Sequence, residues 1–188
     1  MSLSPGFADP VADAQSCFRA VLDAMARPGR VQEVGGVSGP APLCNAAAAV
    51  LLTLADPEAP LWLDAAAACA RAWIEFHTGA PILPMADAMF AMALSLPVLA
   101  ELPNGTDEMP ETSATVILQV SSLATGRRFV LAGPGLREPA LLTIDGMPAD
   151  FSSIWGRNHA LFPRGIDLIL CAGNRLAALP RSVTIRDA

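Results

Sequence analysis

A chain of 188 residues is most simply one domain, over residues 1–188, and 53% hydrophobic residues can supply a large core. A formal charge of −6, with no basic cluster larger than Arg127-Arg128, argues against nucleic acid as a partner, since phosphate binding needs several cations on one face. The longest apolar run, residues 46–55, is half of the ~20 residues that a membrane span requires. The first residues lack the basic and apolar regions of a signal peptide, so we expect a cytoplasmic chain outside the membrane.

The first predicted element is a helix in the opening thirty residues. Asp9 can cap its first turn, Pro10 stands where a missing N–H costs nothing, and Pro28-Gly29 ends it. Apolar residues recur at helical spacing at Val11, Ala14, Phe18, Val21, Leu22 and Met25. This pattern predicts an amphipathic helix.

A second helix is expected from a cap at Asn45 through Ala55, after an irregular link at residues 35–40. Because it is apolar all round, we expect it to be buried. A short strand at Pro60–Leu63 follows it. A helix capped by Asp64 comes next and ends at Gly79, and its apolar face would carry Cys69, Trp73 and Phe76. Residues 88–94 fit either a strand or a helix, and residues 96–102 fit a short helix.

The second half is richer in strands. Residues 115–120 form a β-branched and apolar run, typical of a strand that is covered on both faces. A turn at residues 124–126 predicts a hairpin into residues 128–132. The remaining predicted elements are strands at 141–144, 166–171 and 182–185 and a helix at 148–161 that presents Phe151 and Trp155. Together these elements predict an α/β fold, a mixed sheet flanked by helices.

All twelve basic side chains are arginine, and the chain contains no lysine. A Schiff base requires a lysine amine, so an internal aldimine with pyridoxal phosphate is excluded. Any bound anion must be held by arginine, backbone N–H groups or helix ends. The four cysteines lack Cys-x-x-Cys spacing and the two histidines lack a metal-binding pattern, so we expect no metal and no cofactor.

Short motifs spread in order along nearly the whole chain resemble one family. They are Gly6–Arg19 with Met25–Gly29, Leu52–Asp56, Pro60–Leu63, Phe76–Pro81, Gly105-Thr106, Pro110-Glu111, Ala114–Val120, Gly133–Leu136, Phe162–Leu170 and Leu179–Arg181. Each is weak alone, but their common order makes the sequence similar to the H subunit of the bacterial carbon–phosphorus lyase machinery, the PhnH family. The match is poorest over residues 138–161.

This resemblance implies a fold like that of pyridoxal-phosphate-dependent transferases, without the cofactor. It implies a homodimer that assembles with the G, I and J subunits of the lyase core complex in alkylphosphonate catabolism. There, ATP and a phosphonate would give a ribose 1-phosphonate 5-triphosphate, and this subunit would support the reaction without catalysing it. Two alternatives remain open: a stand-alone module that binds a nucleotide or phosphonate, and an enzyme that acts on phosphate or phosphonate esters.

Three candidate residues have a structural and a functional interpretation. Arg19 shares a helical face with Gln15 and Asp23, as part of a solvated charge ladder or of a ligand or interface site. His77 lies at a helix C-terminus, where it could stabilise the helix or line a ligand site. Gly135 lies in a strand-ending turn or offers backbone N–H groups to an anion.

The best site candidate combines residues 162–167 with residues 179–181. Asp167 would open a buried strand, and a partly desolvated carboxylate usually needs a partner. Arg181, at the end of a neighbouring element, could pair with it, either in a structural ion pair or in a ligand site. No nucleophile motif or phosphate loop is present in the sequence, which predicts no catalytic residue.

Overall fold

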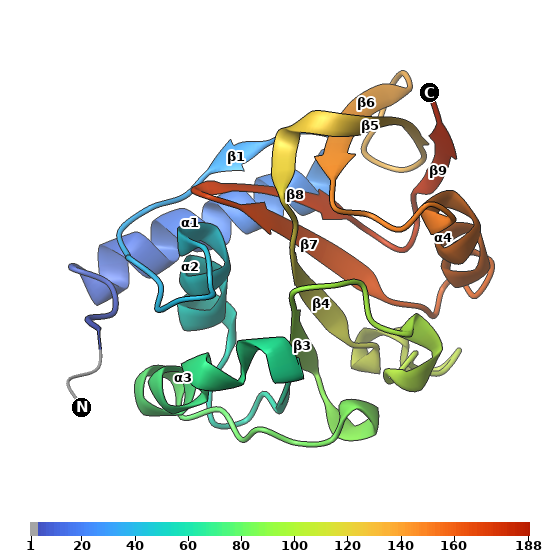
Figure 1. Cartoon of the computed structure of the whole chain (residues 1–188). Helices are drawn as coiled ribbons and strands as arrows, with labels where there is room; N and C mark the ends of the chain where they lie inside the picture. Colours follow the sequence, from blue (N-terminus) through green and yellow to red (C-terminus); the bar gives the residue numbers. More distant parts are fainter. Residues whose placement is uncertain (1–3) are drawn as a thin grey trace.

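The computed structural model describes residues 4–188, which form a six-stranded mixed sheet and a smaller three-stranded sheet, with helices packed on them (Figure 1). The large sheet has the order β1-β8-β7-β4-β3-β2. Its strands are β1 (Gln32–Glu33), β2 (Leu61–Leu63), β3 (Phe90–Ala93), β4 (Thr115–Gln119), β7 (Asp167–Ala172) and β8 (Arg175–Leu179). Strands β2, β3, β4 and β7 are parallel, and β8 and β1 add antiparallel pairs. The α/β class and the mixed sheet are therefore confirmed.

Alternate residues of the central strands face two separate cores. Ile169 and Cys171 of β7 pack into one core, and Leu168 and Leu170 pack into the other. Strands β3, β4 and β8 divide their side chains in the same way. Because successive side chains of a strand point to opposite faces, this run of apolar residues requires a cover on each side of the sheet.

Helices α1 (Pro10–Ala26), α2 (Asn45–Leu54) and α3 (Arg71–Thr78) contribute to the first core. The predicted cap of α1 is confirmed, because the Asp9 carboxylate accepts hydrogen bonds from the backbone N–H groups of Val11 and Ala12. The predicted apolar face is only partly buried. Val11, Phe18 and Leu22 are 68%, 46% and 51% exposed, whereas Cys17, Val21 and Ala24 are buried.

Helix α2 is buried as predicted, but its cap differs from the prediction. Cys44 is the N-cap residue and Asn45 is the first helical residue. The Asn45 side chain instead accepts from the backbone N–H of Gly39 and donates to Asn174, so it fixes two neighbouring loops.

The predicted helix after Asp64 is split into a 3-10 turn, η1 (Ala65–Ala70), and α3, which ends at Gly79 with φ of +69°. Its predicted apolar face was wrong at two positions, since Cys69 and Phe76 are exposed. The third predicted position, Trp73, is buried as expected, and Ile74 is buried beside it. The change from a 3-10 to an α geometry alters the angle between successive side chains, so a single helical period does not describe the segment.

The second sheet and α4 (Phe151–His159) supply the cover on the other face (Figure 1). Its order is β6-β5-β9, with β5 (Ser122–Ala132), β6 (Ala140–Asp145) and β9 (Thr184–Asp187). The predicted hairpin at residues 124–126 was wrong: β5 runs through the expected turn and pairs with β6 and β9 rather than with β4. A register shift between Ser122 and Arg127 accommodates Gly126, which has φ of +114°. The strands β1 and β8 were not predicted from the sequence.

The remaining regular segments are short 3-10 turns. They are η2 (Met85–Asp87), η3 (Leu99–Glu101) and η4 (Pro110–Thr112). The ambiguous residues 88–94 contain β3, and the short helix expected at 96–102 is reduced to η3. No helix in the described part of the chain combines the length and apolar character needed to cross a membrane.

Candidate functional site

Asp167 and Arg181 form the ion pair that the sequence predicts. Asp167 is the first residue of β7, and Arg181 follows β8, which pairs with β7 in antiparallel fashion. The Arg181 guanidinium donates from Nη2 to Oδ2 at 2.6 Å and from Nε to both carboxylate oxygens at 3.1 and 3.2 Å. The Arg181 backbone N–H donates to Oδ1 at 2.7 Å. The side chains of Arg181 and Asp167 are only 15% and 12% exposed.

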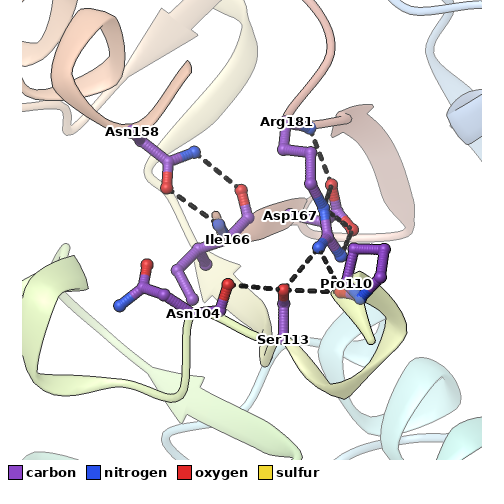
Figure 2. Close-up of polar contacts among 7 residues, drawn as sticks. All are labelled: Asn104, Pro110, Ser113, Asn158, Ile166, Asp167 and Arg181. Atoms are coloured by element: carbon purple, nitrogen blue, oxygen red, sulfur yellow. Dashed lines mark hydrogen bonds and ion pairs between the residues drawn. The ribbon is translucent and has the colours of Figure 1, made fainter. Parts of the chain in front are cut away.

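The remaining nitrogen of the guanidinium connects this pair to the segment before β4. Nη1 of Arg181 donates to the Pro110 carbonyl at 2.7 Å and to Oγ of Ser113 at 2.5 Å. The Ser113 hydroxyl also lies 2.7 Å from the Pro110 carbonyl and 2.9 Å from the Asn104 carbonyl. Figure 2 shows how these contacts join three segments that are far apart in the sequence.

Asn158 of α4 fixes the residue that precedes Asp167. Its amide donates to the Ile166 carbonyl and accepts from the Ile166 N–H, both at 2.8 Å (Figure 2). Asn158 is 4% exposed, so it holds the start of β7 from within the core. Asn158 lies seven residues, or about two helical turns, after the buried Phe151, so both side chains lie on the buried face of α4. This spacing is the sequence signal by which a buried role for Asn158 could have been predicted.

This polar cluster is defined as Asn104, Pro110, Ser113, Asn158, Ile166, Asp167 and Arg181, and the ion pair at its centre is satisfied internally. Each guanidinium nitrogen of Arg181 donates to a protein acceptor, and each oxygen of Asp167 accepts two hydrogen bonds. A buried charge pair is tolerated when hydrogen bonds complete it in this way. The geometry therefore provides neither a free base nor a free cation at this position.

Arg19 and Gly135 come together on another part of the surface. Both border a shallow depression beside the last turns of α1, whose other lining residues include Asp23 and Arg27. Arg19 is exposed and donates to the Gln15 side chain at 3.4 Å. Gly135 has φ of +84°, and a Cβ atom there would lie 2.3 Å from the Ala26 carbonyl oxygen. Glycine is therefore required for the close approach of this turn to α1.

His77 belongs neither to the polar cluster around Asp167 nor to the depression that Arg19 and Gly135 border. Its Nε2 lies 3.1 Å from the Ser4 carbonyl, which also accepts a hydrogen bond from Nε1 of Trp73. The His77 ring centroid is 4.9 Å from that of Trp73 and 5.0 Å from that of Phe76. His77 thus contacts the segment that precedes α1. The other histidine, His159, contacts the Arg181 carbonyl at 2.9 Å.

The cysteines lie in different environments, and no disulfide joins them within the described residues. Burial raises the pKa of Cys17 and Cys44, and it raises that of Cys171 well above its usual value. Cys69 is exposed. Among residues 4–188, no three His, Cys, Asp or Glu side chains are grouped as metal ligands.

These observations define an α/β protein in which the buried ion pair of Asp167 and Arg181 is hydrogen-bonded to other residues of the same fold. The chain belongs to the family of bacterial phosphonate metabolism proteins called PhnH, whose model matches residues 5–186. A Rhizobium meliloti protein, named as subunit PhnH of alpha-D-ribose 1-methylphosphonate 5-triphosphate synthase, is 39% identical over 97% of this chain and 94% of its own length. A Stutzerimonas stutzeri protein, the putative C-P lyase subunit HtxG, is 31% identical over 91% of this chain and 85% of its own length.

Proposed function

We propose that this chain is an accessory subunit of the carbon–phosphorus lyase machinery of phosphonate catabolism. Within it, the chain would support formation of a ribose 1-phosphonate 5-triphosphate from ATP and a phosphonate. The observation that carries the proposal is the match to the Rhizobium meliloti protein, which is named as a synthase subunit and covers nearly the whole chain. The internally bound Asp167–Arg181 pair supports a role without catalysis, because neither residue has a free group for acid–base chemistry.

In this proposal, Asp167 and Arg181 stabilise the fold, and Gly135 and His77 have structural roles. The chain forms a homodimer and assembles in the cytoplasm with the G, I and J subunits. The exposed apolar residues of α1 support a subunit contact: Val11, Phe18 and Leu22 recur at helical spacing and share one side of the helix. Arg19 lies beside this stripe and would form its polar border.

The proposal also covers the domain organisation of the chain and the fold to which it is related. We propose a single domain over residues 1–188, and the central strands β3, β4, β7 and β8 support it because each contributes side chains to both cores. The fold is related to that of pyridoxal-phosphate-dependent transferases, and the block of parallel strands with antiparallel additions supports this relationship. The cofactor itself has no lysine to which it could attach.

Co-expression with the G, I and J subunits tests the assembly, with size exclusion and light scattering as the measurement. We expect one stoichiometric complex that contains this chain. Phe18→Glu should release the chain from the complex or dissociate its homodimer, because it places a charge in a desolvated contact. Met89→Glu is the matched control, since Met89 is 47% exposed, close to the value for Phe18, and precedes β3, which β4 and β7 separate from the α1-contacting strand β8.

Two results would contradict this assignment. A chain that remains a separate homodimer in the presence of all three partners would favour the stand-alone binding module. Turnover of phosphate or phosphonate esters by the isolated chain would favour an enzyme.

A further inference from the structure

A groove lined by arginines runs along the last turns of α1. Its first part is the depression that Arg19 and Gly135 border, and its second part lies between the end of α1 and the turn from β5 to β6. The two parts share Arg27 and Gly135, so they are continuous. Four of the twelve arginines of the chain line this arginine groove: Arg19, Arg27, Arg30 and Arg137.

These four cations have a single carboxylate among them. Asp23 forms ion pairs with both Arg27 and Arg30, whereas Arg19 and Arg137 have no carboxylate partner within residues 4–188. The other arginines that form ion pairs each have a carboxylate of their own: Arg71 with Glu75, Arg127 with Asp187, Arg164 with Asp107, Arg175 with Glu33, and Arg181 with Asp167. The groove therefore concentrates positive charge on a chain whose formal charge is −6.

The end of α1 accounts for only part of this charge. The helix dipole stabilises cations at the last turn of a helix, and Arg27 is the C-cap residue of α1. Arg19 lies two turns earlier, and Arg137 comes from a different segment, so the dipole accounts for neither. Glu138 follows Arg137 in the sequence but is not among the residues that line the groove.

The length of the groove favours a chain of negative charges over a single small anion. Arg19 and Arg27 are eight residues apart on one side of α1, which corresponds to ~12 Å along the helix axis. About four residues of an extended peptide cover that distance. The four arginines are all exposed and line two successive parts of the groove rather than one pocket.

Apolar side chains lie among these cations. Leu22 and Leu136 line the groove, and Leu22 is 51% exposed. Leu22 also belongs to the apolar stripe of α1 that we assign to a subunit contact, so the groove continues that surface. A nucleic acid would extend beyond the groove over a chain with 18 acidic side chains, so a short acidic protein segment is the better match.

We propose that the arginine groove binds an acidic segment of a partner protein. Carboxylates of this segment pair with Arg19 and Arg137, and an apolar side chain of the segment packs on Leu22. The inference rests on the proposed function, because the partner is another subunit of the lyase complex, and it adds the chemistry of the contact.

Titration of the full chain with a fluorescently labelled oligoglutamate peptide tests the groove. We expect saturable binding that weakens as salt is raised, because salt screens exposed charge pairs. Unlabelled oligoglutamate should displace the labelled peptide, whereas inorganic phosphate at the same concentration should not.

Arg19→Glu combined with Arg137→Glu should lower the affinity for oligoglutamate by about tenfold or more, because two attractive charge pairs become repulsive. The fold should be retained, as checked by circular dichroism, since neither arginine pairs with a carboxylate. Arg128→Glu combined with Arg186→Glu is the matched control, because both residues are exposed, lie outside the groove and form no ion pair within residues 4–188. It makes the same change in net charge and should lower the affinity by less than about twofold.

Three results of the titration would overturn the inference. They are absence of saturable oligoglutamate binding, an equal loss of affinity in the two double variants, and displacement of the peptide by an equal concentration of inorganic phosphate or of single-stranded DNA. The first result rejects an acidic ligand, the second assigns binding to the overall charge, and the third assigns the groove to a different class of anion.

Co-expression of the same variants with the G, I and J subunits separates this inference from the proposed function. We expect the complex with Arg19→Glu and Arg137→Glu to dissociate at lower salt than the complex with the control variant. Equal salt resistance of the two complexes rejects this inference alone, whereas failure of the unsubstituted chain to assemble rejects the proposed function.

Discussion

Replacement of Arg181 by methionine should strongly destabilise the fold. The substitution leaves the Asp167 carboxylate with one donor, the backbone N–H of residue 181, and removes the Nη1 donor from Ser113 and Pro110. Removal of one partner from a buried ion pair costs about 3–5 kcal/mol. Small proteins have a total stability of about 5–15 kcal/mol, so this is a large fraction. In a chain of this size the loss corresponds to a decrease in Tm of roughly 6–20 °C.

Urea unfolding at fixed protein concentration measures this loss of stability. Arg175→Met is the matched control, because Arg175 and Glu33 form an exposed pair at 3.5 Å that should contribute less than about 1 kcal/mol. Asp167→Asn combined with Arg181→Met should cost less than the sum of the single substitutions, since the pair is then removed as a unit. An equal, small loss for Arg181→Met and Arg175→Met would refute a structural role for the cluster.

Three further predictions concern other parts of the molecule. Gly135→Ala should lower the free energy of unfolding by at least about 1–2 kcal/mol, measured in urea, because its φ of +84° is costly for alanine and the new methyl group meets the end of α1. Iodoacetamide should label Cys69 rapidly, whereas Cys171 should react only after unfolding, since burial raises the pKa of its thiol and blocks access; mass spectrometry detects both. Hydrogen bonds from Arg127 and Ser152 lower the pKa of Asp187. The stabilisation by this carboxylate is therefore present above its usual pKa and is lost as the pH falls through the lowered pKa. In Arg127→Gln, an NMR titration should show a higher pKa for Asp187 than in the unsubstituted chain.

The elements that could be predicted are those with complete local signals. Helix α1 has a capping aspartate and a terminating Pro-Gly, and β4 and β7 are continuous apolar runs. The strand β8 lacks such a signal, because its sequence Arg-Leu-Ala-Ala-Leu suits a helix as well as a strand. Pairing with the antiparallel neighbours β7 and β1 determines its conformation.

The candidate site likewise has one part that local sequence signals predict and another part that depends on long-range packing. The pairing of Asp167 with Arg181 could be predicted, because each follows or begins a buried strand and a desolvated carboxylate needs a cation. The participation of Ser113 could not, since it depends on how the connection before β4 packs across 68 residues of sequence separation. The hairpin prediction failed for a related reason: β5 leaves the large sheet after β4, and the turn-like residues 124–126 accommodate a register shift instead.

The order of the parallel strands bears on where a ligand can bind. In open α/β sheets, ligands favour the crevice at the carboxyl ends of the strands, where the strand order reverses. Here β2, β3, β4 and β7 follow one another across the sheet without a reversal, over the part of the chain that the structure describes. The cluster around Asp167 lies at the opposite ends, where β7 begins. The fold therefore supplies no switch-point crevice among its parallel strands.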